Sequence, residues 1–263
     1  MDISRFIANE GELPLDNIVN DGGFFKIFRR VAVIGDSLSS GEFESRGEHG
    51  IYGFHDMYEY SWGQFMAREA GSTVYNWSRA GMTAGEYATS YARLMGWWDG
   101  DKDAQAYIIA LGVNDFRADY PLGTIDDVKS RNTSPSFAYY LSMIIERYKV
   151  RQPNAKFFLM TTLRSEGDSP EKIKQKEAHR QLLLDLAEYY DYTYVLDLYT
   201  YAPVYDNEFR RNFYLGGHMN PQGYVFTSKI VMSYIDYIIR QNPEDFAQVG
   251  FIGKPYHNES CKW

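Results

Sequence analysis

Serine and histidine, two residue types that carry out nucleophilic catalysis, occur beside turns that follow or precede regular segments. Ser37 lies in GDSL, directly after the apolar run VAVIG, and His218 lies in LGGHMNPQG, just before a helical segment. Between them, Gly81 lies in SRAGMTAG and Asn114 lies in GVND, each just after another apolar run. Acyl transfer requires a nucleophile, a base and uncharged hydrogen-bond donors, and these residue types can supply all three. The chain has no G-x-S-x-G motif, so Ser37 is not the serine of an α/β-hydrolase elbow.

The segments that must position these residues alternate between strand and helix. Near-continuously apolar runs are typical of strands that are covered on both faces. Such runs occupy residues 31–35, 73–77, 106–112, 156–162 and 192–198. Since a helical segment follows each run, the pattern predicts right-handed crossovers and a parallel sheet. We expect a three-layer α/β/α sandwich around a five-stranded parallel sheet.

Helix signals and long loops complete this prediction. A Ser-Pro pair at 169–170 and an Asn-Pro pair at 220–221 each predict an N-cap followed by proline in the first turn. Residues 39–60 and 115–135 show no clear period and are interpreted as loops. Loops after the carboxyl ends of strands build the ligand crevice of an open α/β sheet. Long loops in a compact domain are usually functional or disordered, so both are candidates for the walls of the site.

With its four blocks in this order, the chain resembles the GDSL esterases and lipases, also called SGNH hydrolases, from Val31 to about Gln241. The resemblance implies a flavodoxin-like α/β/α fold and a serine hydrolase. It implies that Ser37 is the nucleophile and that His218 is the general base. It also implies an oxyanion hole formed by the backbone N–H groups of Ser37 and Gly81 and by the side-chain amide of Asn114. Each such donor typically contributes roughly 3 kcal/mol to transition-state stabilisation.

The chain departs from this family at the residue that orients the histidine. The family has an Asp three residues before its catalytic His, and that position is Leu215 here. A leucine side chain accepts no hydrogen bond. Three alternatives remain open: a Ser37-His218 dyad, a backbone carbonyl that orients the imidazole, or a carboxylate from elsewhere, such as Asp206 or Glu208.

Composition and charge exclude several other classes of protein. The chain has 27 Lys and Arg against 35 Asp and Glu, with a net charge of −8, which is not the field of a nucleic-acid-binding protein. Cys261 is the only cysteine, so the chain forms no internal disulfide. No secretory signal and no run of about 18 apolar residues is visible, so no membrane partner is expected. We expect a cytoplasmic protein, or a secreted one if a signal has been removed.

The domain organisation and the ligands follow from the same pattern. We expect one domain over residues 1–263, with an N-terminal extension at 1–29 and a C-terminal tail at 245–263. No cofactor and no metal is expected, because the histidines His49 and His55 match no metal-binding spacing. His179 is interpreted as part of a charged helix face. Asp36 and Asp115 are interpreted as structural residues that hydrogen-bond to their own loops.

Aromatic residues make up 17% of the chain, and some of them bear on the substrate. Those in the two long loops can stack on sugar rings, and we expect Tyr52, Phe54 and Phe116 to line the pocket. The leading hypothesis is a serine esterase that hydrolyses a carboxylic ester, with an O-acetyl ester of a carbohydrate as the suggested substrate. A non-catalytic binding module, favoured by Leu215, and an acyltransferase with the same residues are the alternatives. A nucleotide-binding protein is disfavoured, because no G-x-G-x-x-G motif or P-loop lysine is present. The oligomeric state stays open.

Overall fold

The central element of the protein, seen in a computed structural model that describes residues 3–254, is a five-stranded parallel sheet. The strand order is β4-β1-β5-β6-β7. These strands are β1 (Arg30–Gly35), β4 (Thr73–Ser78), β5 (Ala106–Ala110), β6 (Lys156–Met160) and β7 (Thr193–Leu196). The three inner strands are buried along nearly their whole length, as their continuous apolar sequence predicts. The predicted α/β fold with a five-stranded parallel sheet is confirmed.

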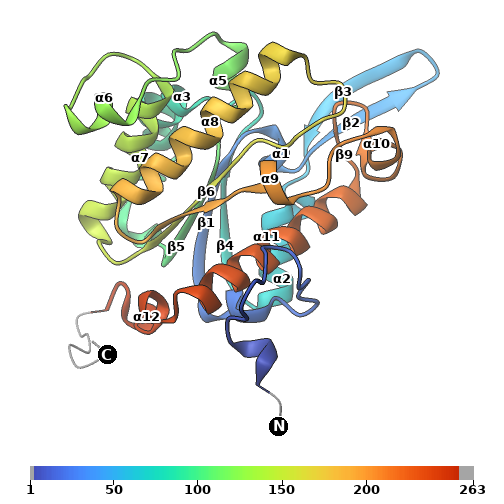
Figure 1. Cartoon of the computed structure of the whole chain (residues 1–263). Helices are drawn as coiled ribbons and strands as arrows, with labels where there is room; N and C mark the ends of the chain where they lie inside the picture. Colours follow the sequence, from blue (N-terminus) through green and yellow to red (C-terminus); the bar gives the residue numbers. More distant parts are fainter. Residues whose placement is uncertain (1–2, 255–263) are drawn as a thin grey trace.

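Helices cover both faces of this sheet. The longer ones are α2 (Trp62–Ala70), α7 (Phe137–Arg151), α8 (Pro170–Tyr189), α10 (Asn207–Phe213) and α11 (Pro221–Gln241). The shorter ones are α1 (Ser37–Ser40), α3 (Ala84–Glu86), α4 (Ala92–Leu94), α5 (Val113–Arg117), α6 (Ile125–Lys129), α9 (Leu198–Tyr201) and α12 (Pro243–Phe246). The predicted helix starts are confirmed, because Ser169 caps α8 and Asn220 caps α11, each followed by proline. In Figure 1, α7 and α8 lie together, away from α2 and α11.

The strand order creates a crevice at the carboxyl ends of the strands. The chain moves from β1 to β4 in one direction and then crosses to β5 on the other side of β1. Right-handed crossovers therefore put α2 on one face and α7 and α8 on the other, and α11 packs against α2. The carboxyl end of β1 is the topological switch point, where open α/β sheets bind their ligands. The segments after β4, β1 and β5 all meet there.

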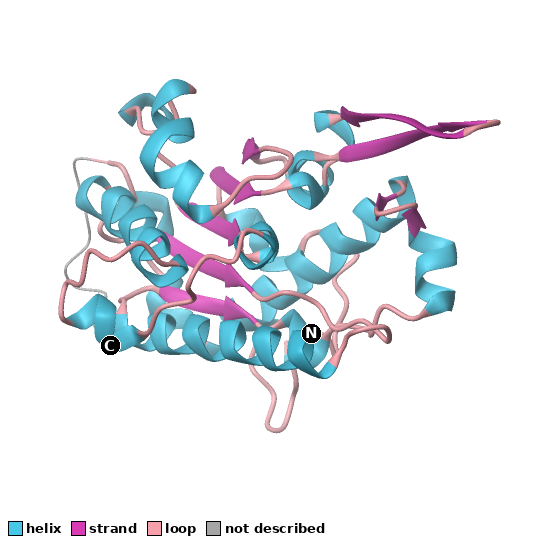
Figure 2. Ribbon diagram, turned by 90° about the horizontal axis from the view of Figure 1, so that it is seen from above, coloured by secondary structure: helices cyan, strands magenta, loops and turns pink. Residues whose placement is uncertain are grey.

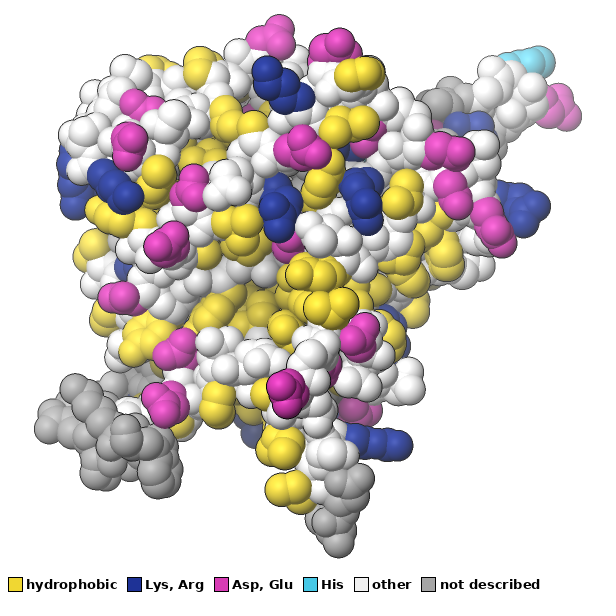
Figure 3. Space-filling model, in the orientation of Figure 1, with side chains coloured by type: hydrophobic (Ala, Val, Ile, Leu, Met, Phe, Trp, Pro, Cys, Tyr) yellow, Lys and Arg dark blue, Asp and Glu magenta, His cyan; other side chains and the backbone are white. Residues whose placement is uncertain are grey.

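The first long loop of the sequence prediction is wrong in one respect, because most of residues 39–60 form a β-hairpin. Strands β2 (Glu42–Gly47) and β3 (Gly50–Asp56) pair antiparallel, with Glu44 opposite Phe54 and Glu42 opposite Asp56. The hairpin projects from the body as a separate arm (Figures 1, 2 and 3). Its alternate charged residues hid the strand pattern, since strands are usually recognised by alternate apolar ones. The second predicted loop, 115–135, also contains the end of α5 and all of α6.

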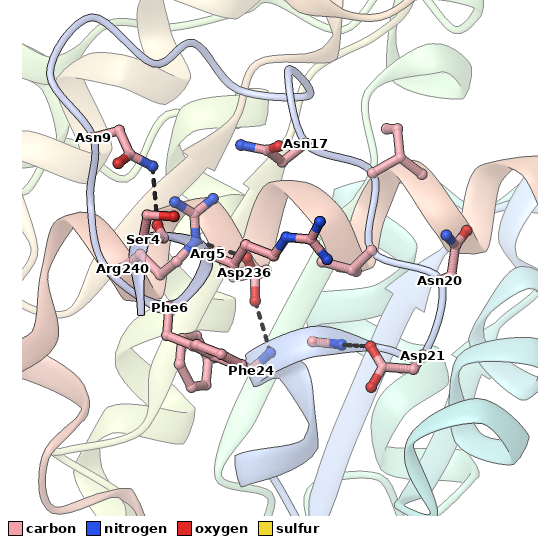
Figure 4. Close-up of a pocket in the computed structure, with 13 residues that line it drawn as sticks. Ser4, Arg5, Phe6, Asn9, Asn17, Asn20, Asp21, Phe24, Asp236 and Arg240 are labelled. Carbon is pink, nitrogen blue, oxygen red and sulfur yellow. Dashed lines mark hydrogen bonds and ion pairs between the residues drawn. The ribbon is translucent and has the colours of Figure 1, made fainter. Parts of the chain in front are cut away.

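The residues of the predicted N-terminal extension that are described pack along α11. Arg240 of α11 is buried and forms hydrogen bonds with Glu12 and Asp236. A cavity of about 640 Å³ lies between this segment and α11 (Figure 4). Pro221 and Arg240 are about 28 Å apart along the helix at 1.5 Å per residue, so the cavity lies far from His218.

Two further findings concern the predictions about membranes and the C-terminus. Within residues 3–254, none of the helices has the length and apolar character needed to cross a bilayer. Cys261 and the end of the predicted C-terminal tail, from residue 255 onward, lie outside the described residues.

Candidate active site

Ser37 is the first residue of α1, directly at the carboxyl end of β1. Asp36 caps this helix, because its carboxylate accepts a hydrogen bond from the Leu38 N–H at 3.0 Å. Gly35 leaves room for the Ser39 side chain, since a Cβ at this residue would lie 2.3 Å from the Ser39 Oγ and 2.6 Å from the Ser39 Cβ. Burial raises the pKa of Asp36 to about 6. Ser37 itself is half-buried, so the turn presents it at the edge of the sheet.

Gly81 and Asn114 follow the two strands that flank β1. Gly81 has φ +74°, and apart from its two neighbours in the chain no described residue lies within 4 Å of the place that a Cβ would occupy. A ligand can therefore approach the backbone of Gly81 closely. The Asn114 Nδ2 donates to the Met82 carbonyl at 3.2 Å and, at the longer distance of 3.4 Å, to the Asp36 Oδ2. These bonds hold the amide between the Gly81 loop and the turn that carries Ser37.

Asp115 fastens the same two loops to each other. Its carboxylate oxygens lie 3.0 and 3.3 Å from the Ala84 N–H, which opens α3 just after Gly81. Asp115 is buried, and burial raises its pKa to about 6. The contacts of Asp36 and Asp115 are structural, as expected. Asp115 goes beyond the expectation in one respect, because it binds a neighbouring loop in addition to the backbone N–H groups of Gly112 and Asp115 in its own.

His218 is held by a glutamate that the sequence reading did not single out. His218 belongs to the two-residue strand β9 (His218–Met219), which pairs with β8 (Tyr214–Leu215) and packs on α1 and β2. The His218 Nδ1 lies 3.1 Å from the Oε1 of Glu44. The same oxygen accepts the Gly217 N–H at 2.6 Å, and the Glu44 Oε2 accepts from the Arg46 Nη2 at 3.3 Å. Although burial alone would raise the pKa of Glu44, these hydrogen bonds lower it.

A second glutamate of β2, Glu42, faces the other ring nitrogen of His218. Its Oε1 lies 3.6 Å from the His218 Nε2, beyond hydrogen-bond distance. Its Oε2 is buried and has no hydrogen-bond partner among the described residues. Burial raises the pKa of Glu42, and His218 opposes this only in part. Glu42 and Glu44 of one strand therefore lie beside the same imidazole, but the pKa of Glu42 is raised and that of Glu44 is lowered.

The carboxylates suggested from sequence are not at the histidine. Asp206 caps α10, where it accepts the Phe209 N–H at 2.7 Å, and Glu208 is exposed on the same helix. Leu215 is 41% exposed, and its side chain supplies no acceptor. Among residues 3–254, the carboxylates within 4 Å of the His218 ring nitrogens belong to Glu42 and Glu44. The geometry corresponds to the third of the three alternatives, a carboxylate from elsewhere, but with a different residue.

The predicted aromatic residues lie in different surroundings. Phe54 is 57% exposed, and its ring contacts the His218 ring edge to face with centroids 5.8 Å apart. Phe116 is half-buried and packs against the His179 ring, with centroids 5.2 Å apart. The side chain of Tyr52 lies outside the described part of the structure. Phe54 is therefore the aromatic side chain that the described structure brings directly to His218.

The interpretation of His179 as part of a charged helix face is wrong. His179 is fully buried, and its ring packs between Phe116 and Phe137. Burial lowers its pKa to about 4, and the nearby Leu111 carbonyl opposes this shift. Neither ring nitrogen has a well-formed hydrogen bond to another described residue. A Cβ on Gly112, whose φ is +126°, would lie 2.6 Å from the His179 Nε2. His179 thus supports the turn that leads to Asn114.

The sequence around Glu44 shows an alternating pattern, but only the structure shows which side of the strand is buried. Glu42 and Glu44 alternate with Phe43 and Ser45, and the strand buries its glutamates more than the residues between them. A strand whose charged side is the more buried one indicates that partners for these charges lie elsewhere in the fold. The family pattern directs attention to the residues just before His218, whereas Glu44 is 174 positions away in sequence.

Comparisons with known proteins agree with this fold and this arrangement of motifs. The sequence model of the GDSL-like Lipase/Acylhydrolase family matches residues 33–226, a range that contains all four blocks. No curated protein matches the chain.

Solved structures with a similar fold include proteins of this family and carbohydrate esterases. A protein assigned to the G-D-S-L lipolytic family from Desulfitobacterium hafniense is 17% identical, with a TM-score of 0.52 over 78% of this chain and 99% of that one. A carbohydrate esterase of family 2 with a carbohydrate-binding domain, from Corynascus thermopiles, is 15% identical, with a TM-score of 0.51 over 85% and 68% of the two chains. The family 3 carbohydrate esterase of Clostridium thermocellum is 17% identical, with a TM-score of 0.50 over 81% and 97%. At these identities the likeness concerns the fold alone. The chain itself belongs to the GDSL-like lipase/acylhydrolase family and has the three-layer SGNH hydrolase fold, which supports the activity of an ester hydrolase.

Proposed function

We propose that this protein is a serine esterase in which Ser37 is the nucleophile and His218 is the general base. The observation that carries the proposal is the setting of His218. Its Nδ1 is engaged by Glu44, which leaves the Nε2 to accept a proton from a serine. The strand that carries His218 packs on α1, the helix that opens with Ser37.

In the proposed reaction, the Ser37 Oγ attacks the ester carbonyl carbon while its proton passes to the His218 Nε2. The carbonyl oxygen becomes an oxyanion, which accepts hydrogen bonds from the backbone N–H groups of Ser37 and Gly81 and from the Asn114 Nδ2. The amide hydrogen now directed at Asp36 over 3.4 Å is the one available to the oxyanion. The C–O bond to the leaving alkoxide then breaks, and the alcohol takes the proton from Nε2. Water repeats the sequence on the acyl-enzyme and releases the acid.

We further propose that the substrate is a neutral ester, such as an O-acetyl ester of a carbohydrate. Glu42, Glu44 and Asp36 surround His218, and Asp56 lies opposite Glu42 in the hairpin. This density of carboxylates disfavours anionic esters, because like charges repel at close range. The exposed ring of Phe54 beside His218 offers a stacking surface for a sugar.

The test combines covalent labelling with an ester series. A fluorophosphonate probe should label the purified protein at Ser37, and S37A should lose both the label and the hydrolysis of p-nitrophenyl acetate. Among p-nitrophenyl esters, kcat/KM should be highest for acetyl and should fall as the acyl chain lengthens. Acetylated neutral sugars should release acetate. An unlabelled Ser37 beside a labelled control hydrolase would point to a binding module on the same fold. Acetyl transfer to an added alcohol in preference to water would point to an acyltransferase.

A further inference from the structure

The β2–β3 hairpin brings two glutamates to His218 from a part of the chain that precedes it by more than 170 positions. In an antiparallel pair, residues directly opposite each other project from the same face. Glu44 is opposite Phe54, and both side chains contact His218. The side of the hairpin that carries Glu44 therefore forms one wall around the imidazole.

The base of this hairpin is fixed to the body of the protein, which holds Glu44 in place. The Tyr224 hydroxyl of α11 donates to the Glu42 carbonyl at 2.8 Å. The Ser40 hydroxyl donates to the Asp56 Oδ1 at 2.6 Å, and the Met57 N–H donates to the Gly41 carbonyl at 2.9 Å. Phe43 packs on Tyr224 with ring centroids 5.5 Å apart.

The segment before His218 is shaped to receive the Glu44 carboxylate. Gly216 has φ +76°, and a Cβ at this residue would lie 1.8 Å from the Glu44 Oε2. A Cβ at Gly217 would lie 3.0 Å from the Glu44 Oε1, the oxygen that accepts the Gly217 N–H. Two successive glycines thus leave the space that the carboxylate occupies, next to the exposed Leu215.

We infer that Glu44, supplied by the hairpin, is the positioning carboxylate of His218 and takes the role that the family assigns to position 215. The inference rests on the proposed function, because it presumes that His218 acts as a base. Glu44 accepts the Nδ1 hydrogen, directs the Nε2 toward Ser37 and stabilises the imidazolium that forms during acyl transfer. It is a positioning residue, since it touches His218 and not the substrate.

Glu42 is the competing candidate, and the structure distinguishes it from Glu44. Glu44 lies within hydrogen-bond distance of Nδ1, whereas Glu42 lies 3.6 Å from Nε2, the nitrogen that must face the serine. The pKa of Glu44 is lowered by its hydrogen bonds, although burial opposes this, and the pKa of Glu42 is raised by burial. Groups whose environments separate their pKa values in this way take different roles, and the one with the lowered pKa suits an imidazolium.

The test is a steady-state comparison of E44Q, E44D, E42Q and E48Q on p-nitrophenyl acetate. E44Q preserves the shape of the side chain and an oxygen that can accept from both the Gly217 N–H and the His218 Nδ1, and it removes the negative charge. It should therefore fold with a thermal midpoint near that of the unchanged protein. Its kcat should fall on the order of 10²- to 10⁴-fold, with KM changed by less than about threefold, because the charge that stabilises the imidazolium acts on the transition state. E44D keeps the charge and should retain at least about ten times the kcat of E44Q.

E48Q is the matched control, because Glu48 is an exposed glutamate in the turn of the same hairpin. Its kcat should equal that of the unchanged protein. The inference is overturned if E44Q keeps kcat within about threefold, if E44D is no better than E44Q, or if E42Q loses more kcat than E44Q. S37A separates this inference from the proposed function: an active S37A contradicts the nucleophile, whereas an inactive S37A with an active E44Q contradicts Glu44 alone.

Discussion

A single added methyl group at Gly216 is expected to remove the carboxylate from His218 and to leave the fold in place. The Cβ of G216A would lie 1.8 Å from the Glu44 Oε2, and ordinary contact begins at 3.4 Å, so the carboxylate must retreat by about 1.6 Å. The atom that gives way is the end of a side chain, so the backbone need not move. A retreat of this size breaks the 3.1 Å contact between Glu44 and the His218 Nδ1.

The expected change in kcat is at least that of E44Q, on the order of 10²- to 10⁴-fold, because both variants deprive His218 of a hydrogen-bonded carboxylate charge. The double variant G216A/E44Q should be no slower than either single variant, since the interaction can be lost only once. The assay is a double-mutant cycle of kcat and KM on p-nitrophenyl acetate, accompanied by thermal unfolding of each variant.

The positive φ of Gly216 adds a separate cost in stability, which needs its own control. A left-handed conformation costs a non-glycine residue about 1–2 kcal/mol. Gly71 has φ +66° at the end of α2, and no other described atom lies within 4 Å of its Cβ position. G71A should therefore lower the thermal midpoint by roughly 2–8 °C and leave kcat unchanged. The reasoning is refuted if G216A keeps kcat within about threefold, or if the losses in G216A and E44Q multiply in the double variant.

Three other expectations follow from the same site. N114A should lose about 10²- to 10³-fold in kcat with little change in KM, because one proposed oxyanion donor is removed. The control N154A, at an exposed asparagine, should keep its kcat. An unimpaired N114A would exclude the amide from the reaction. The free energy of unfolding of E42Q should increase relative to that of the unchanged protein as pH rises from about 4 to about 8, because burial raises the pKa of Glu42 and the fold disfavours its charge. The same difference between the two proteins in urea unfolding at both pH values would contradict this. For His179 the pH dependence of stability has the opposite direction, because burial lowers its pKa to about 4. Its contribution to the free energy of unfolding, up to about 3 kcal/mol, is complete above about pH 6.5 and is lost on acidification. H179L should lack this loss, whereas an H179L variant with the same pH dependence as the unchanged protein would rule it out.

The strands of the central sheet were predictable from sequence because of where they lie. Strands covered on both faces must be apolar throughout, and the runs at 31–35 and 106–112 show this without any knowledge of their neighbours. The helix starts at Ser169 and Asn220 were predictable for a local reason as well, since each cap bonds to a backbone N–H three residues on. Interactions within a few residues, or burial of a whole segment, leave a pattern that one sequence reveals.

The hairpin and His179 were not predictable in this way, because their character depends on distant partners. Lys and Glu residues surround His179 in the sequence of α8, yet its own side is covered by Phe116 and Phe137. In the hairpin, Glu42 and Glu44 are the residues that the strand buries, which reverses the usual polarity of a half-exposed strand. A charge is buried only where something compensates it, and that partner, His218, lies far along the chain.

The position of the carboxylate has a consequence for how substrate contact and catalysis are connected. An acid placed three residues before the histidine would be fixed by the same short segment as the imidazole. Here the carboxylate shares its face of the hairpin with Phe54, which the proposed substrate would contact. A force that displaces Phe54 also acts on Glu44 through the paired backbone, so changes at Phe54 should affect kcat as well as KM. An acid on the arm that is proposed to contact the substrate makes the orientation of His218 depend on the position of that arm.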